Sequence, residues 1–158
     1  MMVQLITESQ KTSHKITQNT TINRWFPSLK NANTITVGNL LTQTSGIVDN
    51  KSELDPGYQL SEAQAVNQAV NRINQNGLAS KSYRYNNDNY ILLAGIIRAY
   101  TGKSCETNLK NRIIKPLGLK HTFMWKAVGR KYAKARSYKF IGKSYQHGVN
   151  PNDRLLSY

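Results

Sequence analysis

Residues 88–100 contain the most constraining pattern in this chain, because a helix over this range would be apolar on nearly all sides. The apolar positions are Ile91, Leu92, Leu93, Ile96 and Ile97. Such a helix needs other elements around it, so we expect it to be central and the most buried in the fold. Asn87 or Asp88 is expected to cap its start, and Gly102 to end it.

Three other helices follow from local signals. Thr36 is a plausible N-cap for a helix over 36–44, and Gly46 lies just past its end. Ser61 and Gln64 form a capping box for a helix over 61–75, whose expected buried stripe is Val66, Ala69, Val70 and Ile73. A further helix is expected from Ser104, with Leu109 and Ile113 facing inward.

The two ends and one connection complete the expected organisation. Residues 1–7 read as the tail of an apolar helix, and residues 49–57 as a turn-rich linker. Aromatic residues around Gly142 predict a hairpin over 135–145. We therefore expect a mainly α fold with a small C-terminal β-hairpin, in a single domain over residues 1–158.

Composition excludes several classes of protein. Cys105 is the only cysteine, so an intramolecular disulfide or a cysteine-rich zinc site is excluded, and a small buried apolar role is expected for it. The three histidines lack metal-ligand spacing, and we expect neither a metal nor a cofactor. There is no apolar run of transmembrane length and no recognisable signal peptide.

The chain is strongly basic, with a formal net charge of +14. Residues 98–143 hold 13 Lys and Arg against the single acid Glu106. Such a surface attracts polyanions, and both nucleic acid and anionic cell-wall polymer stay open as partners. A basic face without a dedicated partner is the alternative interpretation.

Four segments in order resemble the serine β-lactamase and penicillin-binding-protein family. The first is residues 35–46, Ile-Thr-Val-Gly-Asn-Leu-Leu-Thr-Gln-Thr-Ser-Gly, and the second is the Tyr-x-Asn element of Tyr85 and Asn87. The third is the turn at 101–104, and the fourth is Lys-Pro-Leu-Gly-Leu at 115–119. The chain is similar to the class C β-lactamases and D-Ala-D-Ala carboxypeptidases, and the resemblance implies the helical lobe of their α/β fold.

The family's nucleophile motif, S-x-x-K, is missing from this sequence, because no serine is followed three residues later by lysine. Lys-Thr-Gly, the family's third element, is also missing. The sequence therefore predicts an incomplete domain that is inactive by itself. Its start would lie just after the nucleophile, and residues 153–158 would approach a glycine-rich segment that is not reached.

The resemblance implies that Tyr85 is catalytic and that Asn87 binds substrate. Each residue also has a structural interpretation: Tyr85 as an amphipathic aromatic at a helix start, and Asn87 as an N-cap. Without the lysines of the two missing motifs, Tyr85 should be a neutral hydrogen-bonding group. Ser45 is expected to be structural, and the two Gly-Lys-Ser triplets lack the glycine that a phosphate loop requires.

Three functions compete at this point. The first is part of a serine hydrolase whose intact form is exported and acts on peptidoglycan peptides or β-lactams. The second is a non-catalytic basic module that binds anionic wall polymer or nucleic acid. The third is a truncated product without a function of its own. A lobe lacking its sheet should expose apolar surface, so self-association is also expected.

Overall fold

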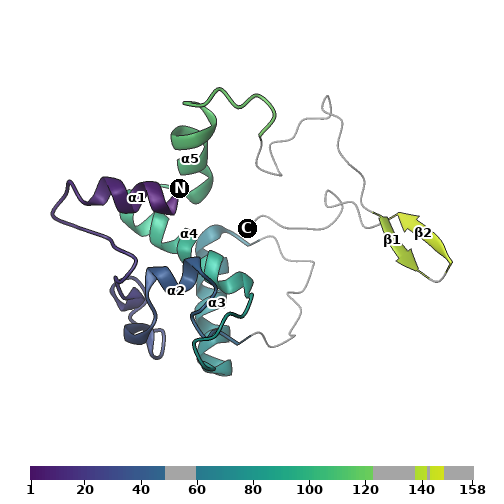
Figure 1. Cartoon of the computed structure of the whole chain (residues 1–158), viewed down its shortest axis with the longest axis horizontal. Coiled ribbons are helices and arrows are strands. Elements are labelled where there is room, and N and C mark those ends of the chain that lie inside the picture. Colours follow the sequence, from purple (N-terminus) through teal and green to yellow (C-terminus); the bar gives the residue numbers. More distant parts are fainter. Residues whose placement is uncertain (49–59, 123–137, 142, 148–158) are drawn as a thin grey trace.

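The computed structural model describes residues 1–48, 60–122, 138–141 and 143–147 (Figure 1). Its helices and strands follow the chain in this order: α1 (Met2–Ser9), η1 (Ile22–Arg24), η2 (Ala32–Thr34), α2 (Val37–Leu41), α3 (Glu62–Asn76), α4 (Asn87–Thr101), α5 (Cys105–Leu109), η3 (Lys110–Ile114), β1 (Tyr138–Ile141) and β2 (Ser144–His147). The predicted linker over 49–57 and the segment 153–158 lie outside the described residues.

Helix α4 is at the centre of the helical part, as its sequence predicts. It contacts α1, α2, α3 and α5, and it contributes more buried residues than any other described helix. Leu92 and Ile96 are fully buried. Gly95 permits close packing here, because a Cβ at this position would lie 3.1 Å from both the Phe26 ring and the Val66 side chain.

Helix α3 confirms the predicted capping box. The Ser61 hydroxyl accepts from the Gln64 backbone N–H, the Gln64 side chain accepts from the Ser61 backbone N–H, and Gly77 ends the helix with φ of 74°. The predicted buried stripe is correct except at Val66, which is only partly buried, while Ala65 is buried instead.

Helix α2 is shorter than predicted. Thr36 caps it as expected, in a reciprocal capping box with Asn39, but the helix ends at Leu41 rather than Thr44. Gln43 adopts a left-handed conformation, φ 60°, which cannot continue a helix. The chain therefore turns at this point.

The helix predicted from Ser104 begins at the predicted residue, but the residue it buries most is not one of those predicted to face inward. Ser104 caps α5, which passes after Leu109 into the π-type turn η3, and the Lys115 N–H donates to the Lys110 carbonyl. Leu109 and Ile113, predicted to face inward, are only partly buried, while Asn108 is buried. Asn108 bonds the carbonyls of Lys103 and Ser104, so a polar residue closes this end of the helix.

Two peripheral elements complete the description. Strands β1 and β2 form an antiparallel hairpin in which Tyr138 pairs with His147 and Ile141 with Ser144. The beginning of the expected hairpin range, residues 135–137, is outside the described part. Within the described residues, no helix is long and apolar enough to cross a membrane.

Candidate functional site

Tyr85 lies immediately before α4, and its side chain projects into solvent. It is 63% exposed, so it is not a core residue. Its phenol hydroxyl donates a hydrogen bond of 2.9 Å to Oδ1 of Asn87. The two polar residues of the Tyr-x-Asn element therefore act as one unit at the N-terminal end of the central helix.

The structure corrects the predicted cap of this helix. Asn86, not Asn87 or Asp88, is the N-cap, and its Oδ1 accepts from the Asp88 backbone N–H at 2.7 Å. Asn86 is buried, while Asn87 is exposed. Because Asn86 performs the capping, the amide of Asn87 is left on the surface beside the phenol.

Gln43 holds the chain on both sides of Tyr85. Its backbone carbonyl accepts from the Arg84 N–H and its side-chain Oε1 accepts from the Asn86 N–H, both at 2.9 Å. Gln43 is buried, so these bonds are shielded from water. The segment 84–86 is thereby fixed against the turn that follows α2.

A buried polar network adjoins the two hydrogen bonds that Gln43 accepts from residues 84 and 86. Asn89 is fully buried and donates from Nδ2 to Gln43 Oε1 at 2.6 Å, while its Oδ1 accepts from the Ser45 hydroxyl at 2.6 Å. Ser45 Oγ in turn accepts from the Ile47 N–H. Ser45 is therefore structural, as its sequence context predicts.

Gly46 lets the two chain segments approach. Its φ is 81°, and a Cβ at this position would lie 2.5 Å from the Ala79 carbonyl oxygen. The Ala79 N–H donates to the Gly46 carbonyl, and Ile47 forms an antiparallel bridge with Leu78. Only glycine fits both the conformation and the space.

Asp88 anchors the start of α4 to α3. It forms an ion pair with Arg72, with Arg72 Nη2 bonded to Oδ1 and Nε to Oδ2. The Asp88 and Arg72 side chains are 11% and 21% exposed. This two-point contact sets the direction in which the helix leaves the site.

Two buried amide nitrogens, Gln43 Nε2 and Asn86 Nδ2, have no acceptor among the described residues. The oxygens of both amides are occupied, by the Asn86 N–H and the Asp88 N–H respectively. Flipping either amide would lose those bonds, so the orientations are fixed by the network.

Other groups with potential chemistry are engaged elsewhere. Lys81, the nearest lysine before Tyr85, donates to the Thr34 carbonyl. Burial, with a further contribution from nearby Glu62, raises the pKa of the Cys105 thiol, which disfavours the reactive thiolate. Among the described residues, no three His, Cys, Asp or Glu side chains come together as a metal site.

The structure thus brings together the two residues singled out from the sequence and adds the buried groups beneath them. Gln43 and Asn89 were missed by sequence reasoning. Asn89 had a detectable signal, because it lies on the same helix face as Leu92, Leu93 and Ile96 and so is a polar residue at a core-facing position.

Comparisons with known proteins agree with the motif pattern. A family model described as Beta-lactamase matches residues 6–155. The chain is 31% identical over 153 residues to the teichoic acid D-alanine hydrolase of Staphylococcus aureus (strain MRSA252) and 33% identical to that of strain NCTC 8325 / PS 47. Each match covers 94% of this chain and 36% of the relative, so the chain spans about a third of the length of these relatives.

Two solved structures are similar in fold. The crystal structure of FmtA from Staphylococcus aureus is 27% identical, with a TM-score of 0.70, and the match covers 96% of this chain and 41% of FmtA. The D-amino acid amidase from Ochrobactrum anthropi SV3, complexed with L-phenylalanine, is also 27% identical, with a TM-score of 0.61 over 75% of this chain and 32% of the amidase.

Proposed function

Because the chain belongs to the beta-lactamase family of serine hydrolases, we propose that it supplies the Tyr-x-Asn wall of an acyl-serine active site. The observation that carries this proposal is the exposed Tyr85 phenol. It donates to Asn87, and the next residue in the chain, Asn86, is bonded to the buried Gln43. A rigid support beneath an exposed polar pair is what a preorganised site requires.

The two side chains suit complementary roles. The Tyr85 phenol can relay a proton: its oxygen takes the proton of a serine hydroxyl that attacks a carbonyl carbon, while its own proton passes to the leaving group. Asn87 Oδ1 accepts from this phenol, so its Nδ2 group is the part that can donate to a substrate carbonyl. The attacking serine is not available as an S-x-x-K motif in these 158 residues, so acyl transfer needs groups beyond them.

The substrate class proposed is a D-aminoacyl ester or amide. The names of the relatives support it, since one is a teichoic acid D-alanine hydrolase and another a D-amino acid amidase. Peptidoglycan peptides ending in D-alanine, and the β-lactams that resemble them, belong to the same broad class of acyl donor. We further propose that the intact enzyme acts at the cell surface or outside the cell, where wall polymers are found.

The 158-residue chain is expected not to react with β-lactams by itself, because no S-x-x-K serine is present to be acylated. The measurement is incubation with nitrocefin and with a fluorescent penicillin, followed by mass spectrometry of the protein. The heat-unfolded chain is the control for non-specific acylation of lysines. A label on the folded chain that is absent from the unfolded one would contradict the proposal and identify its nucleophile.

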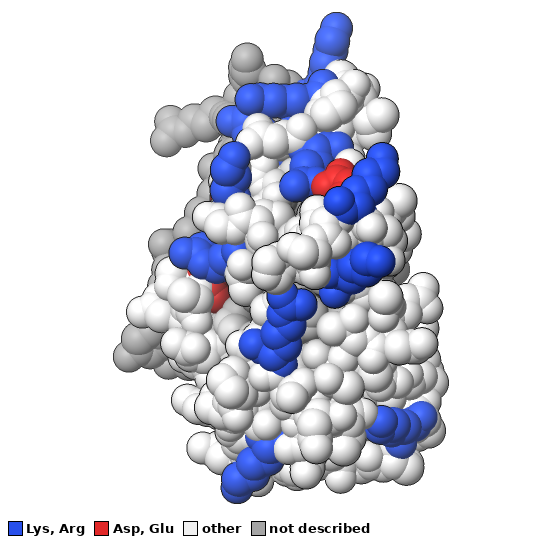
Figure 2. All heavy atoms as spheres, turned by 90° about the vertical axis from the view of Figure 1, so that its left-hand side faces the viewer, with Lys and Arg blue, Asp and Glu red and all other residues white. Residues whose placement is uncertain are grey.

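A second candidate function, binding of an anionic polymer, is favoured by the distribution of charge. Lysine and arginine side chains spread over the face shown in Figure 2, where few acidic side chains are visible. Part of the basic stretch 98–143, residues 123–137, lies outside the described structure.

Retention on a polyanion resin is expected to fall steeply as salt is raised, because basic side chains release counterions from the polymer when they bind. The measurement is elution from heparin resin over a salt gradient. Retention that does not weaken with salt would argue against an electrostatic surface.

A further inference from the structure

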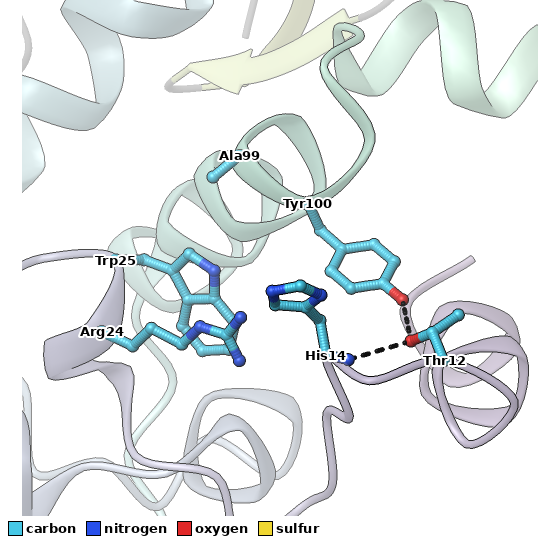
Figure 3. Close-up of a pocket in the computed structure, with 6 residues that line it drawn as sticks. All are labelled: Thr12, His14, Arg24, Trp25, Ala99 and Tyr100. Atoms are coloured by element: carbon cyan, nitrogen blue, oxygen red, sulfur yellow. Dashed lines mark hydrogen bonds between the residues drawn. The ribbon is translucent and has the colours of Figure 1, made fainter.

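A surface pocket lies at the opposite end of α4 from the Tyr-x-Asn element (Figure 3). Its volume is about 350 Å³, within the range of small-molecule sites. It is lined by Thr12, His14, Arg24, Trp25, Ala99 and Tyr100. A helix rises ~1.5 Å per residue, so Tyr100 lies roughly 20 Å along α4 from Asn87, and the pocket is a separate site.

Arg24 provides a cation at this pocket that is not neutralised by any described residue. Its guanidinium carbon lies 5.5 Å from the centre of the Trp25 ring, within cation–π range. In the described part of the chain, the carboxylates in ion pairs belong to Glu8, Glu62 and Asp88, none of them with Arg24. The indole is partly buried, and the exposed Arg24 guanidinium lies over its ring at the pocket.

Three further polar groups line the pocket beside the guanidinium. The His14 ring lies between Trp25 and Tyr100, and its Nδ1 is 3.1 Å from the Ser13 hydroxyl. The Tyr100 hydroxyl lies 3.3 Å from the Thr12 hydroxyl, which also accepts from the His14 backbone N–H and donates to the Ser9 carbonyl. These contacts fix the loop after α1 against the end of α4.

Basic side chains lie close to the pocket. None of the described residues that line it is acidic, and Lys11 and Lys15 flank Thr12 and His14 in the same exposed loop. This loop forms the left edge of Figure 1, which is the side that faces the viewer in the strongly basic view of Figure 2. An anion approaching this side meets an attractive potential before it makes any contact.

We propose that this pocket binds the phosphate ester of a small polyol. A guanidinium presents a planar pair of donors that matches two oxygens of a phosphate. The imidazole adds a donor at another angle, which suits the several oxygens of a phosphate better than the two of a carboxylate. The Thr12 hydroxyl already donates to the Ser9 carbonyl, so the Tyr100 hydroxyl is the donor in the contact between the two hydroxyls. The Tyr100 hydroxyl oxygen can accept from a hydroxyl of the polyol, and the aromatic rings of Trp25 and Tyr100 can contact its carbon chain.

The probe for this site is sn-glycerol 3-phosphate, and Trp25 is a built-in reporter. The sequence has two tryptophans, so a Trp125→Phe background leaves Trp25 as the only indole. We expect a saturable change in its fluorescence with glycerol phosphate and none with glycerol at the same concentrations. Arg24→Gln should weaken binding about tenfold or more, because charge-assisted bonds to the phosphate are lost.

Lys30→Gln is the matched control, since it removes the same charge from an exposed side chain that does not line the pocket. It should change the dissociation constant less than twofold. Arg24→Lys, which keeps the charge but loses the planar fork, should resemble Arg24→Gln more than the parent, with circular dichroism reporting that each variant is folded. Equal weakening by Arg24→Gln and Lys30→Gln, an equal response to glycerol, or no saturation would each overturn the proposal.

Discussion

Replacing Asp88 with alanine is expected to destabilise the protein by about 3 kcal/mol, because it leaves the partner of a largely buried ion pair uncompensated. Arg72 is only 21% exposed and bonds both oxygens of Asp88. The same change removes an acidic side chain from the first turn of α4, where it interacts favourably with the helix dipole. Urea unfolding followed by circular dichroism measures the loss.

Glu8→Ala is the matched control for this prediction. Glu8 pairs with Arg112 on the surface, and its side chain is 46% exposed. Water screens such a pair, so its removal should cost roughly 0.5 kcal/mol or less, although the change in net charge is the same. Similar losses for the two variants would show that the Asp88–Arg72 pair is no stronger than a surface pair.

The Asp88 pair also matters for the site, because Asp88 follows Asn87 directly. A double variant, Asp88→Ala with Arg72→Ala, should be less destabilised than the sum of the single changes, since neither charge is then left alone. This coupling would show that α3 helps to fix the helix end on which Asn87 and Tyr85 are presented.

Local sequence signals predict the helices of this protein more accurately than they predict the long-range contacts that hold Tyr85 and Asn87 in place. The Ser61–Gln64 capping box depends on residues three apart, and the structure contains it as predicted. The apolar pattern of α4 is equally local, and it correctly predicts the central helix. Such signals work because the interaction and the pattern cover the same short stretch of chain.

The N-cap of α4 shows where local signals are insufficient. Asn86, Asn87 and Asp88 are consecutive, and all three are favourable capping residues. Contacts from far along the chain distinguish them, because Gln43 binds the Asn86 N–H and Arg72 binds Asp88. Asn87 is left exposed beside Tyr85 as a consequence of those two contacts, which the sequence pattern alone does not reveal.

The length of α2 has a similar explanation. Its sequence continues the apolar spacing to Thr44, but Gln43 leaves the helical conformation. In this conformation its backbone carbonyl accepts from the Arg84 N–H, and its side-chain Oε1 accepts from the Asn86 N–H. A non-glycine residue with φ of 60° is uncommon. Here the residue with this conformation is Gln43, which bonds to the residues on both sides of the candidate catalytic Tyr85.

Gln43→Ala is accordingly expected to destabilise the protein by about 3 kcal/mol, because two buried donors, the Asn86 N–H and Asn89 Nδ2, lose the acceptor Oε1. Alanine keeps the unfavourable φ but contributes none of the side-chain bonds. We also expect the substitution to raise the rate at which the Asn86 amide exchanges with deuterium. The increase over the parent should be larger at Asn86 than at amides in the middle of α4. Urea unfolding and amide exchange by NMR measure the two effects.

Gln64→Ala removes the same side-chain amide from an exposed capping box and should cost about 0.5–1 kcal/mol. If both glutamine variants lost stability equally, or if exchange at Asn86 rose only as much as in the centre of α4, Gln43 would be an ordinary turn residue. A larger and local effect at Asn86 would instead mean that Tyr85 is positioned by a residue 42 places earlier in the chain. The positions of Tyr85 and Asn87 would then depend on the turn after α2 as much as on α4.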